Sequence, residues 1–532
     1  MANDPEYDAL YAAVCAAPDD DAPRLVLADW LDEHNDPHRA AYIRAQVGLA
    51  QARAADPHAA AVFDFFSHRD APDGWHKYGD RAAASPAVGR MEEFRKQELR
   101  YEKRAWTRWN AALPRRKAGT VREYERGFPL LIDLPDTGRY AALAEKRPGE
   151  PLPGYEFYLN SPTEEELDAL LASGLFGAVR GLRGFRVESV EFVRKLGKLP
   201  AARNFRRLML HPHENTTEIL ATVAAEPNWA GLTHLEMYAE ANEANLPPAF
   251  FRAKHLRQLE RLGLGLTNLT EAQCAALGRM KWPRLQALDI YGCRNWGAVG
   301  LGLEKSDFPE LQSLDLMACS LGDAGATALA KCKELKNLAT LNLTYNDIDD
   351  GKALAALIAG PAFPALAGLN LFGNKCRALD AKALASDGRG PTLRLLSLGD
   401  CGLYSKTAEA LAAAPALTEL VCLDLGGNNF GDSGVKALVR AAQWDRLRCL
   451  SLRENKITAK GVAELTEWPA LANLADFDLR DNPIGLDGAK ALAACKALRK
   501  CRHVALPTDE RFVPTEGLKL LRETFGKGAG IG

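Results

Sequence analysis

A twelvefold repeat occupies the C-terminal part of the chain and restricts the folds available to it. Each unit has the frame apolar-x-x-apolar-x-apolar-x-x-Asn/Cys/Asp, and successive frames begin 26 to 28 residues apart. A period in the twenties is typical of a solenoid in which one supersecondary unit recurs. Positions are numbered here from the first apolar residue of each frame. The frames open at Phe205, Leu232, Leu259, Leu285, Leu311, Leu338, Leu366, Leu393, Leu420, Leu447, Leu474 and Cys501.

The first half of each unit has the alternation of a short strand. In the unit that opens at Leu338, positions 4 and 6 are Leu341 and Leu343, which we expect to point into the core. Position 9 follows the strand, where a polar side chain can bind backbone groups of its own turn and of adjacent repeats. We therefore predict a ladder of stacked side chains at this position. Its members are Cys293, Cys319, Asn346, Asn374, Cys401, Asn428, Asn455 and Asn482.

The second half of each unit has Ala and Leu at helical spacing. Asp323 precedes one such stretch and is predicted to cap its helix. A strand and a helix in every unit predict an α/β fold, a right-handed solenoid with a concave parallel sheet and convex helices. A small helical module is expected to precede this solenoid.

The repeats resemble the ribonuclease-inhibitor-like class of leucine-rich repeats. The stretch from Leu420 to Leu438 carries the pattern most clearly, and the resemblance covers residues 205–510. Weaker apolar pairs upstream predict degenerate repeats over residues 127–204, and residues 511–532 are expected to form a cap helix and a flexible tail. These pairs are Leu130/Ile132, Phe157/Leu159 and Phe185/Val187, which we assign to positions 4 and 6.

Residues 1–55 are predicted to form a separate helical hairpin. Leu27, Trp30, Leu31 and His34 share one helical face, and Asp36-Pro37 ends that helix. The segment resembles a short bacterial repeat-companion domain, a family that precedes leucine-rich and other repeats and has no defined biochemical role.

Four carboxylates of this hairpin could suggest a metal site. Without a pair of histidines or a calcium-binding loop, a solvated helix face is the favoured interpretation. The residues are Asp29, Asp32, Glu33 and Asp36.

Residues 56–126 form a helical, charge-rich connecting segment in this interpretation. Between Arg90 and Arg126 twelve basic and six acidic residues give a surplus of six positive charges, with Trp106 and Trp109 among them. Basic residues interleaved with aromatics can bind nucleic acid. Their helical spacing from Glu92, Glu93, Glu98 and Glu102 favours a salt-bridged, exposed helix instead.

Composition narrows the classes of protein to which the chain can belong. A formal net charge of −2 and the absence of an 18-residue apolar run argue against a general nucleic-acid or membrane binder. The acidic N-terminus lacks the features of a signal peptide, so we expect a cytoplasmic protein. Eleven cysteines without a Cys-x-x-Cys motif predict reduced thiols.

One column of side chains has metal-binding chemistry. Cys422, Cys449, Asp476 and His503 hold position 3 of four successive repeats. Strands about 4.8 Å apart would spread the column too far for one zinc ion to bind all four. A metal or a disulfide at Cys422 and Cys449 is left open, and we expect neither a metal site nor a cofactor.

The side chains at the outward positions 3, 5 and 7 would determine which partner such a solenoid binds. We predict a non-enzymatic scaffold that binds a protein on the concave face, since no motif for catalysis is present. The alternatives are a GTPase-activating or other regulatory protein that uses edge arginines, and nucleic-acid binding through residues 90–126. The predicted partner-binding residues are Tyr238, Tyr291, Met317, Phe372, Arg453 and Arg480.

Overall fold

The computed structural model describes most of the chain, and its residues fall into two compact units. Unit 1 comprises residues 1–60, 90–273 and 280–291, and unit 2 comprises residues 61–89, 274–279 and 292–532. The side chains of residues 102–108, 120–125 and 128–133, and that of Cys15, are outside the description. The described residues are 4–17, 20–65, 84–108, 120–125, 128–133, 156–172, 176, 179–239, 244–266, 269–293, 308–376, 379, 384, 393–440 and 444–526.

The front of the chain is helical. Asp4 and Asp36 cap α1 and α3 by accepting hydrogen bonds from backbone amides of the first turn, and a proline opens both helices. Leu27, Trp30 and Leu31 of α2 pack into a core with α1 and α3. The helices are α1 (Pro5–Ala16), α2 (Ala22–Glu33), α3 (Pro37–Ala55), α4 (Pro57–Phe65) and α6 (Pro86–Arg108).

In unit 1, an antiparallel pair begins a sheet that then continues in parallel, in sequence order, to β8. The strands are β1 (Thr120–Glu125), β2 (Phe128–Asp133), β3 (Glu156–Asn160), β4 (Gly181–Phe185), β5 (Arg207–His211), β6 (His234–Tyr238), β7 (Arg261–Gly265) and β8 (Ala287–Ile290). The α-helices between them are α8 (Glu164–Ala172), α9 (Val190–Lys198), α10 (Thr216–Ala225) and α11 (Glu271–Gly278), and α11 belongs in part to each unit. Short 3-10 helices precede β5, β6 and β7: η4 (Pro200–Asn204), η5 (Pro227–Gly231), η6 (Phe250–Arg252) and η7 (Lys254–Gln258).

Among the described residues of unit 2, eight short parallel strands follow one another in sequence order. They are β9 (Ser313–Asp315), β10 (Thr340–Asn342), β11 (Gly368–Asn370), β12 (Leu395–Ser397), β13 (Cys422–Asp424), β14 (Cys449–Ser451), β15 (Asp476–Asp478) and β16 (His503–Ala505). The α-helices are α13 (Gly322–Leu329), α14 (Gly351–Ala359), α16 (Ser405–Ala413), α17 (Gly431–Val439), α18 (Ala459–Thr466), α19 (Gly485–Ala494) and α20 (Thr515–Phe525). The 3-10 helices are η10 (Pro415–Leu417), η11 (Pro469–Asn473) and η12 (Leu498–Lys500).

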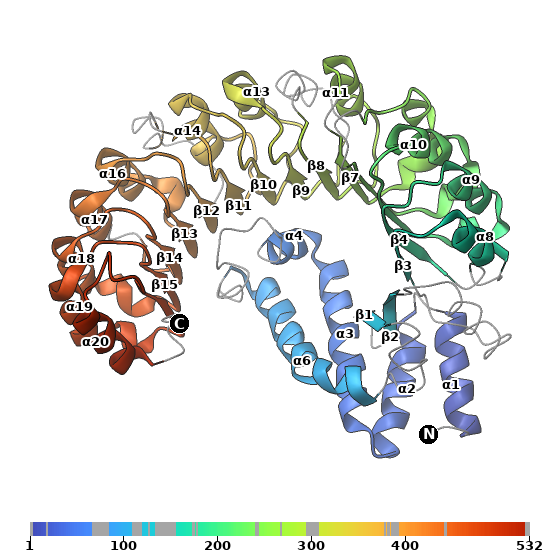
Figure 1. The fold of residues 1–532 in the computed structure, drawn as a ribbon, viewed down its shortest axis with the longest axis horizontal. Coiled ribbons are helices and arrows are strands. Elements are labelled where there is room, and N and C mark those ends of the chain that lie inside the picture. Colours follow the sequence, from blue (N-terminus) through green and yellow to red (C-terminus); the bar gives the residue numbers. More distant parts are fainter. Residues whose placement is uncertain are drawn as a thin grey trace. The chain divides into compact units, whose positions relative to one another are not determined.

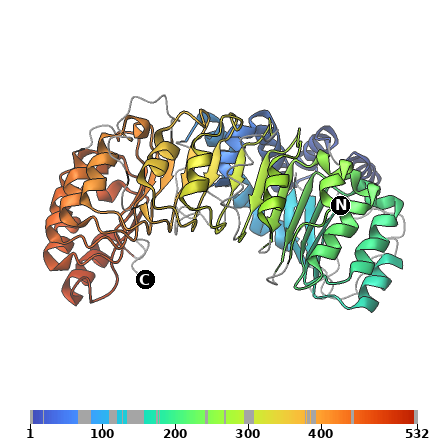
Figure 2. The same cartoon turned by 90° about the horizontal axis from the view of Figure 1, so that it is seen from above.

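Strands and helices of unit 2 form two layers (Figures 1 and 2). The helices lie along one side of the strands, and the register pairs Leu341 with Leu369 and Leu369 with Leu396. These side chains are fully buried between the layers. The chain is therefore an α/β solenoid built from leucine-bearing repeats.

Two features recur in the turns that follow the strands from β8 to β15, a left-handed residue at position 8 and a set of side-chain hydrogen bonds at position 9. The residue at position 8 is left-handed in every repeat from β8 to β15, with φ between 51° and 72°. At position 9, the Oδ1 of Asn346 accepts from the amides of Cys319 and Leu321 in the preceding repeat, both at 3.1 Å. Its Nδ2 donates to the carbonyl oxygens of Leu316 and Thr344. Asn374, Asn428 and Asn482 bond in the same way. Oδ1 of Asn455 accepts from the amide of Phe430 at 3.4 Å, and its Nδ2 donates to the carbonyl oxygen of Leu425.

The register of the upstream strands differs from the expectation. Leu182 pairs with Leu208, so Leu182 and Gly184 hold positions 4 and 6 of β4, and the assignment of Phe185 and Val187 was wrong. Val187 is fully buried and its side chain fills the space beside Gly184, which explains why its apolar character was misleading.

The same correction applies to β2. Ile132 pairs with Phe157, which places Ile132 at position 4 rather than 6. The assignment of Phe157 and Leu159 agrees with the register of β3.

Asp323 does not cap its own helix. It is the second residue of α13, and its Oδ1 accepts from the amides of Asp349 and Asp350 in the next repeat, both at 2.7 Å. Asp432 makes the equivalent bridge from α17 to Thr458 and Gly461. These aspartates therefore join adjacent repeats.

Candidate functional site

The candidate site is the open face of the sheet, which we define as the face formed by positions 3, 5 and 7 and turned away from the helices. Side chains alternate across a strand, so these positions point opposite to the buried positions 4 and 6. In unit 2, position 7 includes Met317, Phe372, Arg453 and Arg480. In unit 1 it includes Tyr238 and Tyr291.

The side chain at position 5 binds the backbone of its own repeat. The side-chain oxygen of Asn370 accepts from the amide of Phe372 at 3.1 Å, two residues later, which is the geometry of an Asx turn. The Asp and Asn residues at this position therefore end the strand. The same bond is made by Asp315, Asn342, Asp424 and Asp478 at 2.9 to 3.1 Å.

Tyr238 leans sideways over the next strand of unit 1. A Cβ added at Gly265 would lie 2.8 Å from Cδ1 of Tyr238, and one at Gly263 would lie 2.6 Å from its hydroxyl oxygen. The ring also lies 5.0 Å from that of His211, between centroids. Tyr238 thus covers the glycine backbone of the adjacent strand.

Phe372 in unit 2 also packs over a glycine of the next repeat. Its ring covers Gly399, where an added Cβ would lie 2.7 Å from Cδ2 of Phe372. The ring of Tyr345 meets that of Phe372 edge on, with centroids 5.6 Å apart. The sequence interpretation had not selected Tyr345, which is 51% exposed.

Tyr345 is a large side chain on the left-handed backbone that position 8 has in each of these repeats. It holds position 8 with φ of 53°, a region in which a side chain with a Cβ is disfavoured. Three other repeats place glycine at this position, Gly292, Gly373 and Gly427. Comparison of position 8 across the repeats would have singled out Tyr345 in the sequence, since its neighbours are small or acidic.

The other predicted contacts differ in exposure. Tyr291 is 51% exposed at the end of β8, whereas Met317 is partly buried and donates its amide to Asp315. Tyr291 belongs to unit 1 and Met317 to unit 2.

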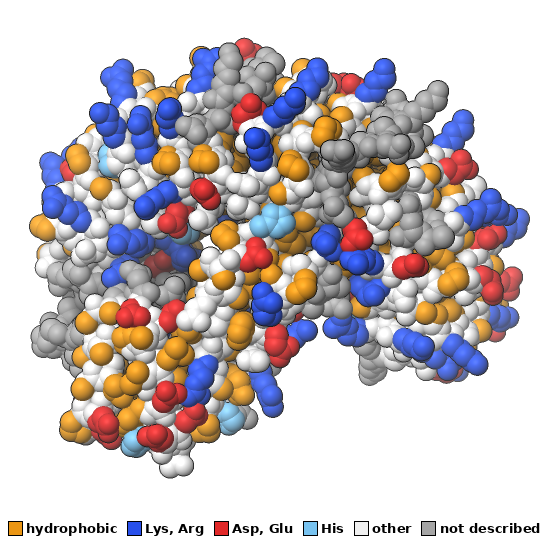
Figure 3. Space-filling model, turned by 180° about the vertical axis from the view of Figure 1, so that it is seen from behind, with side chains coloured by type: hydrophobic (Ala, Val, Ile, Leu, Met, Phe, Trp, Pro, Cys, Tyr) orange, Lys and Arg blue, Asp and Glu red, His pale blue; other side chains and the backbone are white. Residues whose placement is uncertain are grey.

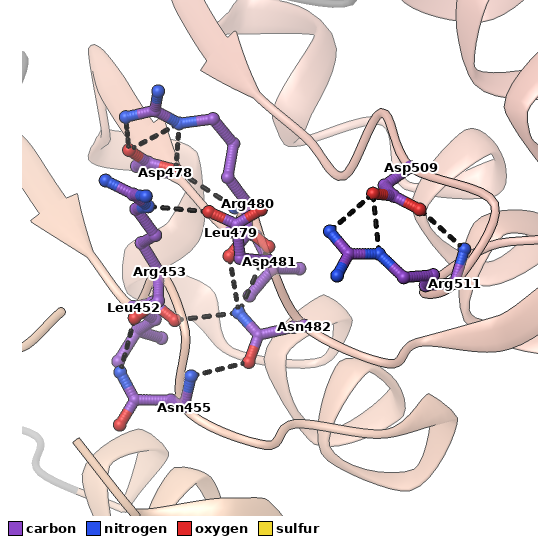
Figure 4. A network of polar contacts seen from close by, with 10 residues as sticks. All are labelled: Leu452, Arg453, Asn455, Asp478, Leu479, Arg480, Asp481, Asn482, Asp509 and Arg511. Atoms are coloured by element: carbon purple, nitrogen blue, oxygen red, sulfur yellow. Dashed lines mark hydrogen bonds and ion pairs between the residues drawn. The ribbon is translucent and has the colours of Figure 1, made fainter. Parts of the chain in front are cut away.

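Both predicted arginines are bound to carboxylates (Figure 4). Nε of Arg453 lies 2.7 Å from Oδ2 of Asp481, and Arg480 contacts both oxygens of Asp478 at 2.5 to 3.0 Å. These pairs lie beside the ladder residues Asn455 and Asn482. The pKa of Arg453 is raised, with burial opposing the hydrogen bond and the charge of Asp481.

A charge network on the open face of unit 1 had not been foreseen. Glu156 is 3% exposed and lies between Arg183, at 2.9 Å, and Arg207, at 3.2 Å. Arg261 in turn contacts Glu236 at 3.3 Å and Asp289 at 2.5 Å. Three cations and three carboxylates therefore neutralise one another.

His234 lies at position 3 of β6, between Arg207 and Arg261 of the adjacent strands. Burial, followed by the charges of Arg207, Arg261 and Arg183, lowers the pKa of His234 to about 3. Burial also raises the pKa of Glu236. The imidazole is consequently neutral at physiological pH.

The column at position 3 is present in the sheet register. Cys422 pairs with Cys449, Cys449 with Asp476, and Asp476 with His503. Sγ of Cys449 lies 3.6 Å from Oδ2 of Asp476. Among the described residues, no three His, Cys, Asp or Glu side chains are close enough to hold a metal ion.

Two of the four front carboxylates, Asp29 and Asp32, have a partner on the neighbouring helix. Arg44 of α3 contacts Asp29 and Asp32 of α2, both at 2.6 Å, and the pKa of Arg44 is raised by the hydrogen bond to Asp29. In the connecting segment, Arg95 pairs with Glu98 at 2.6 Å. The side chains of Trp106 and Trp109 lie outside the described part.

Comparison with known proteins identifies the repeats. Residues 310–330, 334–351, 417–439, 447–465 and 471–493 match the family described as Leucine Rich repeat. The chain contains leucine-rich repeats. The matched segments contain the frames that open at Leu311, Leu338, Leu420, Leu447 and Leu474.

Two solved structures are similar to the chain at low identity. An internalin from Listeria monocytogenes is 18% identical with a TM-score of 0.38, over 65% of this chain and 89% of the internalin. Toll, in the Toll–Spatzle complex of Drosophila, is 16% identical with a TM-score of 0.42, over 71% of this chain and 53% of Toll. No curated protein matches the chain in sequence. Within the described residues, no helix combines the length and apolar character needed to cross a bilayer.

Proposed function

We propose that the chain is a non-enzymatic scaffold that binds a protein on the open, concave face of its leucine-rich repeats. Leucine-rich repeats commonly act as rigid surfaces for other macromolecules. The single observation that carries the proposal is the pair formed by Tyr345 and Phe372. It combines exposure and aromatic chemistry at one place.

Tyr345 takes the left-handed backbone that position 8 has in every repeat from β8 to β15, and its ring packs over Gly373 of the next repeat. A residue with a Cβ in the left-handed region costs about 1–2 kcal/mol. Half of the side chain is exposed, and an exposed tyrosine supplies both apolar area and a hydroxyl to a partner.

Phe372 holds the exposed ring in place. The edge-on contact fixes the orientation of Tyr345 before a partner arrives, and Phe372 itself is braced against Gly399. Preorganised aromatic side chains lose little entropy on binding and are frequent among residues that dominate interface energies.

Tyr345→Gly is the variant that tests the proposal. Glycine suits a φ of 53°, so the variant keeps the turn and loses only the ring. Tyr404→Ala is the matched control, because Tyr404 is another tyrosine with 49% exposure and lies just before α16. We expect a protein captured from native lysate by wild type and by the control to be lost with Tyr345→Gly. Equal capture by all three chains would reject Tyr345 as a binding residue.

The GTPase-regulator alternative gains no support from the edge arginines. Arg453 and Arg480 are paired with Asp481 and Asp478, so a role in stabilising a phosphoryl-transfer transition state would require these pairs to break. In the described part of residues 90–126, the pair of Arg95 with Glu98 supports the salt-bridged helix. Both signs of charge are interspersed on the face drawn in Figure 3.

Several finer assignments remain part of the proposal. The α-helix of eight to ten residues that follows most strands of unit 2 supports the ribonuclease-inhibitor-like class. The repeat-companion identity of residues 1–55, the bacterial source and the cytoplasmic location rest on the sequence alone.

A further inference from the structure

The middle of the open face in unit 2 is covered. Thr340, Gly368 and Leu395 hold position 3 of β10, β11 and β12 and are paired in register. Thr340 is 1% exposed, Leu395 is fully buried, and Gly368 is also buried. Cys422, Cys449 and Asp476 are buried further along the same column, and Ser313 and His503 at its two ends are partly exposed. An outward position that carries a fully buried leucine must have other atoms above it.

The covering group at Gly368 is Phe65, the last residue of α4. A Cβ added at Gly368 would lie 3.2 Å from Cδ1 and 3.3 Å from Cε1 of the Phe65 ring, and 3.3 Å from Cγ2 of Thr340. The ring therefore rests on glycine backbone beside the threonine methyl. Residues 61–65 and β9–β16 belong to the same compact unit.

Glycine at position 368 makes this close approach possible. The adjacent strands carry side chains at position 3, namely Thr340 and Leu395, so the missing side chain leaves a shallow site between them. Its walls are a methyl group and a leucine, and its floor is backbone. This chemistry suits a flat, apolar ring.

We infer that Gly368, Thr340 and Leu395 form a site for an aromatic side chain, and that Phe65 fills this site as a tethered competitor of the partner. The inference rests on the proposed function, because it assumes that a protein binds this face. A partner that presents an aromatic side chain must displace Phe65, so the chain limits access to its own binding surface.

Phe65 is only partly buried and ends its helix, beyond the buried Ala59, Val62 and Phe63 of α4. α4 has only nine residues, and an isolated helix of that length is marginal in water. Its connection through the chain keeps Phe65 at a high effective concentration near the site. Such a contact lowers the apparent affinity of a partner by the fraction of chains in which the site is open.

Thiol protection in the full chain tests the occupancy. Thr340→Cys places a thiol beside the ring, and its reaction with N-ethylmaleimide is compared with and without Phe65→Ala. The parent chain without the introduced thiol supplies the background of native cysteines. We expect Phe65→Ala to speed the reaction by about tenfold or more, because protection of a buried thiol follows the opening of its cover. Equal rates would overturn the inference.

A second pair of variants guards against misfolding. Gly368→Leu fills the site from the strand and should release α4, seen as faster amide exchange over residues 57–65. Leu99→Ala, an exposed apolar residue of α6, is the control and should change neither readout. Unchanged exchange in Gly368→Leu, with the variant folded by circular dichroism, would also overturn the inference.

A synthetic peptide with the sequence of residues 57–65 tests the chemistry of the site. Added to the Phe65→Ala, Thr340→Cys chain, it should slow the maleimide reaction, whereas the same peptide with alanine at position 65 should not. Equal effects of the two peptides would overturn the aromatic preference. These readouts need no partner, so their failure is distinguishable from failure of the Tyr345→Gly capture experiment.

Discussion

At the scale of single residues, the ladder at position 9 depends on the two different halves of an amide. Oδ1 of Asn482 accepts from the amides of Asn455, at 2.9 Å, and Ile457, at 3.0 Å. Its Nδ2 donates to three carbonyl oxygens, those of Leu452, Leu479 and Arg480, at 2.8 to 3.2 Å. The side chain is fully buried, so water cannot replace any of these bonds.

Replacement of the Nδ2 donor of Asn482 by an acceptor should therefore lower the stability of the fold. Asn482→Asp turns a carboxylate oxygen towards the three carbonyl oxygens and should lower the free energy of unfolding by about 3 kcal/mol or more. Asn482→Cys should cost about half as much, because a thiol still donates to a carbonyl, as Cys401 does to Leu371 at 3.2 Å. Urea unfolding measures both, and equal losses would contradict the role assigned to the amide.

His234 gives unit 1 a predictable response to acid. Its pKa is about 3 in the folded chain, below the usual value of 6.5, so the unfolded chain binds more protons between these pH values. Stability is therefore lost as the pH falls through this window, by up to about 1.4 kcal/mol per pH unit.

His234→Gln isolates this contribution from that of Glu236, whose raised pKa acts in the opposite sense. We expect the free energy of unfolding of wild type, relative to that of the variant, to fall between pH 6 and pH 4. Urea unfolding followed by hydrogen exchange at the amides of unit 1 measures this difference. Parallel pH profiles would show that His234 is not kept neutral.

At the scale of secondary-structure elements, the periodicity of the sequence predicted which strand residues are buried. Leu341 and Leu343 are buried because alternation along a strand is visible in the sequence. The left-handed backbone of Tyr345 was missed because side-chain type does not report the sign of φ. The predicted register of β4 was wrong because position 6 holds Gly184 instead of an apolar residue. The side chain of Val187, from the turn after the strand, fills the space beside this glycine. The cover at Gly368 involves residues far apart in the sequence, which no local pattern reveals.

The aspartate bridge between α17 and α18 is an element-scale contact with a clear test. The Asp432 carboxylate accepts from the amides of Thr458 and Gly461 and from the Thr458 hydroxyl, at 2.7 to 2.9 Å. Asp432→Ala should cost about 1–2 kcal/mol, the usual loss of a helix cap, although the helix stabilised lies in the next repeat. Hydrogen exchange should therefore increase in α18. Asp487→Ala in the first turn of α19 is the control, and equal exchange in both variants would contradict the bridge.

At the scale of the whole molecule, stacked repeats should lose stability from the damaged end inwards. Within unit 2, Leu518 and Leu521 of α20 and Val513, just before that helix, are buried at the last repeat. Gly517 approaches Ala489 of α19 closely enough that an added Cβ would lie 3.1 Å from the Cβ of Ala489. Leu521→Ala should cost about 2–4 kcal/mol locally, since its side chain is fully buried. Because each repeat contacts chiefly its neighbours, amide exchange should accelerate most in α19 and β16 and little in β10. Lys519→Ala, on the exposed side of α20, should leave exchange unchanged. A uniform increase across unit 2 would instead mean that its repeats unfold together, and that coupling along the stack is stronger than the contacts between adjacent repeats imply.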